Sequence, residues 1–384
     1  MHTAAPRPMP FDPAALALLG DLSRRILAAL PRQPDAVALG YWLRPAHLKS
    51  IAARYPLPAD GLRVPAGLAF HVPPSNVDGM FVYSWAVGVL AGNRQVVRLS
   101  HRRGAVAERL LALLGEALAA FPLGAGSAFI EYERDDAITA AISRRADLRV
   151  IWGGDATIAA IRAVPLSPHA REVAFADRVS LAVLDAGAVL ALDEDGLAGL
   201  ARRLFNDVLT FDQMACSSPR RLVWRGPEES ADRADARLTQ AMRAEIARRL
   251  YGIPDAVALD KYAAACRAGL RQPLRAIDAG RLDWVTVDLG AGAVLPPAGP
   301  HPGGGLIYRS RVTELAELVP SIDRAVQTLS HFGIPAADLA SFAAMLGGRG
   351  VDRLVPLGQA LAFDIVWDGQ DLIDAFTRRV TLCP

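Results

Sequence analysis

A single cysteine occupies the stretch Phe205-Asn206-Asp207-Val208-Leu209-Thr210-Phe211-Asp212-Gln213-Met214-Ala215-Cys216-Ser217-Ser218-Pro219-Arg220. The stretch follows a predicted helix over Asp195 to Phe205 and precedes Leu222 to Trp224, an apolar run typical of a strand. Between them we expect a loop in which Cys216 has small neighbours. Such neighbours leave a thiol room to meet a substrate, and backbone amides in a turn can stabilise a developing oxyanion. The loop alone leaves two interpretations of Cys216 open, a nucleophile and a buried packing residue.

The composition is that of a large protein with a substantial core. The chain has 384 residues, of which 52% are hydrophobic, so two domains or more are expected. A net charge of +2 argues against general nucleic-acid binding. Cys216, Cys266 and Cys383 are too widely spaced for a disulfide framework or a zinc pattern. Because no signal peptide and no apolar run of membrane-spanning length is found, we expect a cytoplasmic protein. We expect no metal, because the cysteines form no zinc pattern.

Strands and helices alternate along the first half of the chain. Apolar runs predict strands over Gly67–Val72, Gln95–Leu99, Phe129–Tyr132 and Leu148–Trp152. Helical patterns follow them over Met80–Leu90, Ala105–Ala120, Asp136–Arg144 and Ala156–Ala163. This alternation predicts an α/β fold with a doubly wound parallel sheet. No GxGxxG fingerprint is present, so an ordinary Rossmann dehydrogenase is not indicated.

Three short segments fall where predicted strands end, which is where parallel sheets bind ligands. They are Pro74 to Asn76, Arg98 to Arg103 and Gly153 to Asp155. Simpler interpretations exist for each segment. Asn76 can cap the following helix, the arginines can form a solvated turn, and the glycines can form a tight turn.

The cysteine segment resembles the nucleophile segment of the acyl-CoA reductase family typified by bacterial LuxC, a branch of the aldehyde dehydrogenase superfamily. The strand-end segments are similar to those of the superfamily. Pro74-Ser75-Asn76 matches a Pro-aromatic-Asn loop, with Ser75 in place of the aromatic residue. Arg98-Leu99-Ser100 is similar to a Lys-Pro-Ser stretch, and Gly153-Gly154 stands where a Thr-Gly-Ser opens a helix under the cofactor pyrophosphate. The resemblance covers most of the chain from about Gly67 to Leu382.

The resemblance implies an aldehyde-dehydrogenase-like fold in three parts. We expect a doubly wound, parallel-sheet cofactor-binding domain over 1–175 and a second α/β domain, catalytic and carrying the cysteine, over 176–355. The C-terminal segment, 356–384, is expected to pack on the first domain or on a partner subunit. In register with the superfamily, Ala174 takes the place of the water-activating Glu, and Arg178 takes the place of a Lys.

The activity implied by the resemblance is NADPH-dependent reduction of an acyl thioester, acyl-CoA or carrier-protein-bound, to the aldehyde through an S-acyl Cys216. Asn76 and the backbone N–H of Cys216 are then the oxyanion donors. Since His101 stands where NAD-specific relatives carry a Glu, nothing there repels the 2′-phosphate of NADPH, and arginines can bind it. The implied cofactor-binding residues are Pro74, Ser75, Arg98, Ser100, Arg102, Arg103, Gly153 and Gly154.

Other functions remain open. An NADP-linked aldehyde dehydrogenase would need the missing Glu. A non-catalytic acyl-binding or structural homologue would not need Cys216 together with Asn76. A cysteine acyltransferase would not need a nicotinamide cofactor. The resemblance further implies a homo-oligomer or a complex with an acyl-activating protein, and leaves the acyl group open.

Overall fold

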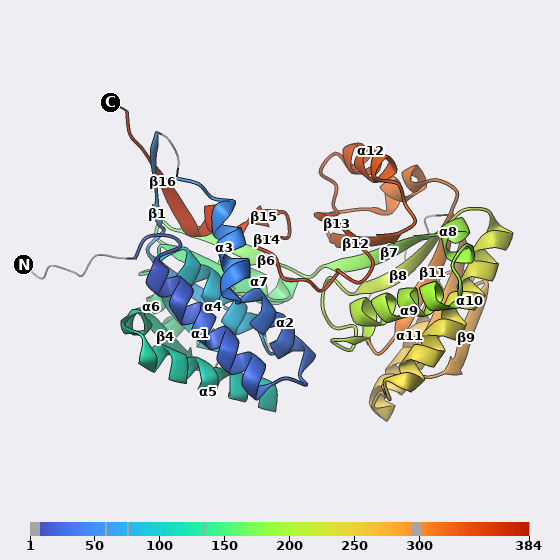
Figure 1. The fold of residues 1–384 in the computed structure, drawn as a ribbon, viewed down its shortest axis with the longest axis horizontal. Helices are drawn as coiled ribbons and strands as arrows, with labels where there is room; N and C mark the ends of the chain where they lie inside the picture. The colour runs from blue at the N-terminus through green and yellow to red at the C-terminus, as the bar shows by residue number, and fades with distance from the viewer. Residues whose placement is uncertain (1–7, 58–59, 75–76, 134, 293–300, 384) are drawn as a thin grey trace, which may run out of the picture. The chain divides into compact units, whose positions relative to one another are not determined.

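The computed structural model describes residues 8–57, 60–74, 77–133, 135–292 and 301–383 (Figure 1). Contacts divide the chain into two compact units. The first is Met1–Asp177 with Phe363–Pro384, and the second is Arg178–Ala362. Each unit is built on its own sheet.

The first unit contains a five-stranded sheet in the order β4-β3-β2-β5-β6, in which all neighbours are parallel. Its strands are β2 (Leu68–Val72), β3 (Arg94–Leu99), β4 (Ser127–Glu131), β5 (Leu148–Trp152) and β6 (Arg171–Phe175). Its helices are α1 (Pro13–Ala29), α2 (Pro34–Trp42), α3 (Pro45–Ala53), α4 (Met80–Leu90), α5 (Ala105–Ala120), α6 (Asp136–Ser143), α7 (Asp155–Arg162), the 3₁₀ turn η1 (Pro122–Gly126) and the C-terminal α13 (Leu372–Phe376). The predicted α/β class and parallel sheet are confirmed.

The strand order reverses between β2 and β5. From β2 the chain passes through β3 to β4 on one side, and then returns to β5 and β6 on the other side. A reversal of this kind opens a crevice at the carboxyl ends of the two central strands, where open α/β sheets bind their ligands. Pro74 follows β2 and Gly153 follows β5, so two of the predicted binding segments flank this crevice.

Helix α4 lies at the centre of the first unit. All of its residues are buried, as expected of a helix that is apolar on every side. Helix α1 packs on the same core through Leu18, Leu22 and Ile26. Its first turn is capped by Asp12, whose side chain accepts the N–H of Ala14 at 2.8 Å.

The C-terminal segment returns to the first unit. Strand β16 (Thr377–Thr381) pairs antiparallel with β1 (Gly61–Pro65), and β14 (Val366–Trp367) pairs with β15 (Gln370–Asp371). Asn93 fastens this return, because its Nδ2 donates to the carbonyl of Phe376 at 2.9 Å. Its Oδ1 accepts the N–H of Gly67 at 2.8 Å, so one amide joins the C-terminal segment to the start of β2.

The second unit contains a seven-stranded sheet in the order β13-β12-β7-β8-β11-β10-β9, parallel except for the edge strand β9. Its strands are β7 (Val179–Asp185), β8 (Pro219–Arg225), β9 (Ala276–Arg281), β10 (Trp284–Ala291), β11 (Leu306–Val312), β12 (Val326–Phe332) and β13 (Arg353–Pro356). Its helices are α8 (Ala186–Leu190), α9 (Glu194–Leu209), α10 (Glu228–Arg248), α11 (Asp255–Arg271), α12 (Ala336–Leu346) and the 3₁₀ turn η2 (Leu315–Ser321).

Helix α9 ends at Leu209, four residues beyond the predicted end at Phe205, so the sequence-based boundary was wrong. The two residues after Phe205 are Asn206 and Asp207, which are weak helix formers. Val208 and Leu209 are buried, however, and no Gly or Pro lies between Phe205 and Leu209. The Asp207 carboxylate accepts the N–H groups of Gly358 and Ala360 at 2.7 and 3.0 Å, although burial raises its pKa to about 7.

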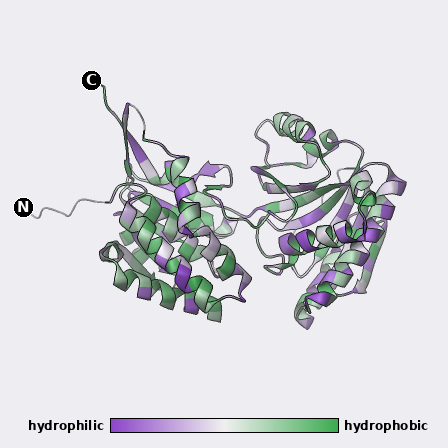
Figure 2. Cartoon of the chain, in the orientation of Figure 1, coloured by the Kyte–Doolittle hydropathy of each residue, from purple (hydrophilic) through white to green (hydrophobic). Residues whose placement is uncertain are grey.

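Hydrophilic and hydrophobic residues are mixed along the outer helices of both units (Figure 2). In α10 the buried residues Ala231, Ala234, Leu238 and Met242 recur at helical spacing on one face. Within the described ranges, no helix is both long enough and apolar enough to cross a membrane.

A buried ion pair supports the end of the first sheet and generates a prediction. Arg149 on β5 is 2% exposed, and its Nε donates to Glu172 on β6 at 2.8 Å. Arg162 reaches the other oxygen of Glu172 from the surface, with its side chain 58% exposed. Arg149→Met should lower the free energy of unfolding by about 3 kcal/mol, because it breaks a buried pair. The matched Arg162→Met should cost less than about 1 kcal/mol. Urea unfolding followed by tryptophan fluorescence measures both values, and equal costs would contradict the assignment.

Candidate active site

Cys216 lies in the turn between α9 and β8. It is half-buried, and the two serines that follow it are buried. The turn contains a sharp corner at Asp212 and Gln213, whose φ angles are 50° and 62°. Left-handed backbone is uncommon for residues other than glycine and costs of order 1–3 kcal/mol at each site. Such a backbone conformation is kept only where hydrogen bonds and packing from neighbouring residues stabilise it.

The side-chain amide of Gln213 provides much of this support. Gln213 is fully buried, and its Nε2 donates to the carbonyls of Pro219 and Leu306, both at 2.9 Å. Its Oε1 accepts the N–H groups of Gly305 and Leu306, both at 3.0 Å. Both donors and both acceptor positions of the amide are therefore used. One side chain joins the cysteine loop to the start of β8 and to the start of β11.

A turn of three glycines, Gly303 to Gly305, packs against the corner at Asp212 and Gln213. All three have positive φ, at 74°, 60° and 81°, and the N–H of Gly304 donates to the carbonyl of Asp212 at 2.8 Å. A Cβ on Gly303 would lie 2.4 Å from that carbonyl oxygen, so a side chain cannot be accommodated without movement.

Lys261 and His301 both form hydrogen bonds with the glycine turn. Lys261 is buried, and its ammonium donates to the carbonyls of Leu282 and Gly304. Burial lowers the pKa of Lys261 to about 8. Burial lowers the pKa of His301 to about 3, so its imidazole is neutral. Its Nδ1 then accepts the N–H of Gly303 at 3.1 Å, while Nε2 contacts the carbonyl of Leu306 at 3.1 Å.

Cys216 itself is held from β7 and β12. The Nε2 of Gln327 donates to the Cys216 Sγ at 3.4 Å. The Ser180 hydroxyl donates to the Cys216 carbonyl at 2.8 Å, and it accepts the N–H of Thr328 at 3.2 Å. The sequence analysis assigned no role to Gln327 or Ser180. The segment Ala325 to Ser330 resembles the reductase family, but no local spacing shows that Gln327 or Ser180 meets the cysteine, because strand pairing brings them there.

The sequence register predicts that Arg178 and Ala174 take the places of a Lys and a water-activating Glu of the superfamily. Arg178 pairs with Asp352, and its Nη2 donates to the carbonyl of Val326 at 3.2 Å, so it joins β7 to β12 within the second unit. Ala174 lies on β6 of the first unit and packs against an apolar cluster that includes Ile151. Neither position carries a carboxylate.

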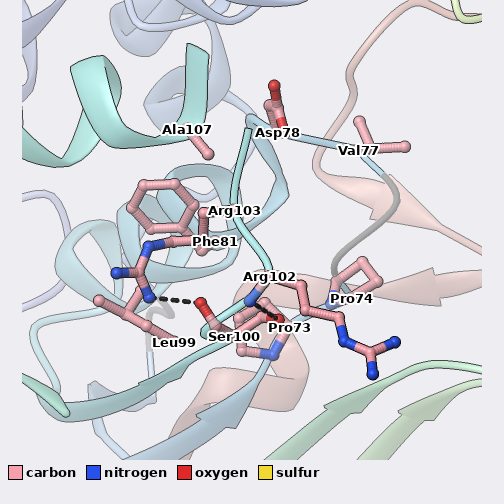
Figure 3. A pocket seen from close by; sticks show the side chains of 10 residues that line it. All are labelled: Pro73, Pro74, Val77, Asp78, Phe81, Leu99, Ser100, Arg102, Arg103 and Ala107. Carbon is pink, nitrogen blue, oxygen red and sulfur yellow. Dashed lines mark hydrogen bonds between the residues drawn. The ribbon is translucent and has the colours of Figure 1, made fainter. Parts of the chain in front are cut away.

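The arginines after β3 occupy three different environments. The Arg98 guanidinium lies over the Tyr132 ring, 4.6 Å from its centroid. Arg103 pairs with Glu108 and Glu131 at 2.9 and 2.8 Å and also donates to the carbonyl of Ser100. Figure 3 shows the Arg102 side chain extending away from Arg103. The side chain of Arg102 is exposed, and its backbone N–H donates to the Ser100 Oγ at 3.1 Å.

This turn borders a hollow beside the end of β2. Its lining brings together four predicted cofactor residues, Pro74, Ser100, Arg102 and Arg103 (Figure 3). The remaining lining residues are Pro73, Val77, Asp78, Phe81, Leu99 and Ala107. The predicted Ser75 and Asn76 lie outside the described residues. Within the described part of the chain, no group of three or more His, Cys, Asp or Glu side chains could hold a metal ion.

Gly153 and Gly154 precede helix α7, whose first turn carries Asp155 and lies beside Asp177. The N–H of Asp155 donates to Asp177 at 3.2 Å, and the N–H of Asp177 donates to Asp155 at 3.2 Å. A Cβ on Gly154 would lie 3.0 Å from the Asp177 Oδ2. Helix N-termini attract anions, and here that attraction is partly satisfied within the chain. Gly154 therefore has a packing reason besides the predicted approach of a phosphate.

A family model described as acyl-CoA reductase (LuxC) matches residues 54–379 of the chain. Among curated proteins, no sequence matches significantly.

Several solved structures share the fold. Aldehyde dehydrogenase 21 from Physcomitrella patens, in complex with succinate, has a TM-score of 0.69 at 12% identity, over 96% of this chain and 85% of its own. A 1-pyrroline-5-carboxylate dehydrogenase from Thermus with bound NAD has a TM-score of 0.67 at 14% identity, over 96% and 80%. The glyceraldehyde-3-phosphate dehydrogenase GapN from Methanocaldococcus jannaschii, complexed with NADP, has a TM-score of 0.64 at 11% identity, over 96% and 89%. The predicted aldehyde-dehydrogenase-like fold is confirmed.

The contacts of Gln213 generate a prediction about the cysteine loop. Gln213→Met should lower the free energy of unfolding by about 2–4 kcal/mol, because it leaves several buried backbone groups without partners. The matched control is Gln240→Met, since Gln240 is exposed on α10. Thermal and urea unfolding of both variants provide the measurement. A Gln213→Met protein as stable as the control would show that the amide does not support the loop.

Proposed function

The chain belongs to the acyl-CoA reductase (LuxC) family, and from this premise we propose that it reduces an acyl thioester to an aldehyde with Cys216 as the nucleophile. The family and the fold support an oxidoreductase that acts on acyl or aldehyde groups. The observation that carries the proposal is the placement of Cys216. The loop that carries its thiol is stabilised by the Gln213 amide, and the buried Gln327 amide contacts the sulfur at 3.4 Å.

The first step exchanges one thioester for another. The Cys216 thiolate attacks the acyl carbonyl, a bond forms between its sulfur and the acyl carbon, and the bond to the coenzyme A sulfur breaks. Coenzyme A leaves as a thiolate and takes a proton from solvent. This exchange requires a thiolate and oxyanion donors more than a strong base. We propose the backbone N–H of Cys216 and the Asn76 amide as these donors.

The cofactor proposed for the second step is NADPH, which supplies a hydride to the acyl carbon when bound. Relatives in fold were solved with NAD or NADP, which supports a nicotinamide cofactor. The turn from Ser100 to Arg103 fits the 2′-phosphate, because it offers a hydroxyl, an exposed guanidinium at Arg102 and no carboxylate at His101. Arg103 would shape this turn through its ion pairs. Pro74, Ser75, Arg98, Gly153 and Gly154 complete the proposed cofactor-binding set.

The product is proposed to be the aldehyde and not the free acid. A water-activating carboxylate near the acyl-cysteine would hydrolyse it before reduction. Ala174, which stands at the corresponding place, instead packs its methyl group against apolar residues. The substrate is an acyl-CoA or a carrier-bound acyl group.

The role of Cys216 is tested by acyl transfer. Incubation with radiolabelled acyl-CoA should label the protein through a thiol-cleavable bond, and Cys216→Ser should abolish both this label and aldehyde formation. A panel of acyl-CoA esters, followed at the NADPH absorbance band, identifies the acyl group. Cys266→Ser is the matched control, since Cys266 is an exposed thiol on α11. Undiminished thiol-cleavable labelling of Cys216→Ser would refute the assignment.

The preference for NADPH is tested at Arg102. Arg102→Ala should weaken NADPH binding roughly tenfold or more while leaving NADH nearly unchanged, because a hydrogen bond to a charged group contributes about 1.5–3 kcal/mol. Dissociation constants at two salt concentrations provide the measurement, and the effect should shrink at high salt. Arg109→Ala removes an equal charge from the exposed face of α5 and serves as the control. Tighter binding of NADH by the unaltered protein would overturn the cofactor assignment.

A further inference from the structure

We propose that Gln327 is a catalytic residue whose side-chain N–H stabilises the thiolate form of Cys216. This inference rests on the proposed role of Cys216 as the nucleophile. Gln327 is 1% exposed, and its Nε2 lies 3.4 Å from the Cys216 Sγ, so it touches the reacting atom directly.

An irregularity in β12 brings Gln327 to the cysteine. Val326 pairs with Val179 and Leu329 pairs with Leu181, so β12 spends one residue more than β7 over this interval. A bulge of this kind re-aims side chains and recurs beside active sites. Here Gln327 reaches the sulfur, while Thr328 holds the Cys216 carbonyl through Ser180. The same bulge therefore positions both the side chain and the backbone of the cysteine.

The orientation of the Gln327 amide is fixed by its neighbour. The Thr328 hydroxyl donates to the Gln327 Oε1 at 3.3 Å, which leaves the NH₂ end toward the sulfur. The reverse orientation would place an amide oxygen against Cys216 and would disfavour a negative charge there.

This contact favours the charged sulfur over the neutral one. Hydrogen bonds to an ionised acceptor are roughly twice as strong as bonds between neutral groups, and burial strengthens them further. A donor to the charged form therefore shifts the equilibrium toward that form. The same N–H assists when the carbon–sulfur bond of the reduced acyl-cysteine breaks, because the electron pair of that bond returns to the Cys216 sulfur as the aldehyde forms.

The test is the pH dependence of Cys216 alkylation by iodoacetamide, followed for each cysteine by peptide mass spectrometry. Gln327→Met removes the donor at similar volume. It should move the midpoint of the rate profile upward by about one pH unit and slow alkylation at pH 7 about tenfold. Gln327→Glu should slow it further, because a carboxylate repels the thiolate. Alkylation of the exposed Cys266 and Cys383 in the same samples should not change, and Gln240→Met controls for loss of an amide elsewhere.

An unchanged midpoint in Gln327→Met overturns the inference. A slowing by the same factor at every pH also overturns it, because that result reflects access to the thiol and not its ionisation. If Gln327→Met fails to fold by circular dichroism, Thr328→Val takes its place, since it releases the amide and should shift the midpoint in the same direction by less.

Alkylation needs neither an acyl substrate nor a nicotinamide, so the two proposals fail separately. A shifted midpoint in a protein that forms no aldehyde from any acyl-CoA supports the thiolate donor and refutes the reductase. Aldehyde formation together with an unshifted midpoint refutes Gln327 alone.

Discussion

The left-handed corner at Asp212 and Gln213 is the constraint on which the candidate active site depends. It turns the chain out of α9 and toward Cys216, and its conformation is unfavourable for residues with a side chain. The Gln213 amide offsets this cost with four buried hydrogen bonds. The partners of that amide lie at the start of β8 and at or just before the start of β11, so the supported conformation of the loop depends on both of these parallel strands.

The glycine turn shows why this arrangement is demanding. Gly303 approaches the Asp212 carbonyl more closely than a side chain would allow, and the Lys261 ammonium binds the carbonyl of Gly304 in the same turn. Segments far apart in the sequence thus share one hydrogen-bonded unit. A substitution that moves one of these segments should also move the backbone near Cys216, because backbone hydrogen bonds connect the segments.

The sequence predicted the architecture well where local pattern and tertiary packing agree. Helices α4 and α5 have the predicted bounds, since their apolar runs are long and are limited by Gly and Pro or by polar turns. The end of α9 was wrong because Asp207 is stabilised by backbone N–H groups from residues 358 and 360, a contact that no local pattern contains. Asp207 is a weak helix former, but it is buried here and its hydrogen bonds connect α9 to residues 358 and 360.

In the candidate site, too, some residues could be predicted from the sequence and others only from their contacts. Cys216 was predicted as a nucleophile from its neighbours and from the family resemblance. Gln327 lies 111 residues away and carries an uncharged amide, a common group for which no spacing rule exists. The arginines Arg98, Arg102 and Arg103 are equivalent in sequence, and only their contacts separate a ring-stacked, an exposed and an ion-paired guanidinium.

At Gly153 and Gly154 the sequence pattern and the structural surroundings point in different directions. Bare glycines at a helix start suggest a phosphate site. Here, however, Asp155 and Asp177 each donate a backbone N–H to the carboxylate of the other, which places two carboxylates at the same helix terminus. An anion at this position would meet two carboxylates, whereas an anion at the Ser100–Arg103 turn would meet an exposed guanidinium together with one carboxylate, Asp78, in the lining of the hollow. We infer that discrimination between phosphate-bearing cofactors is concentrated at that turn, and that the glycine pair contributes shape more than charge.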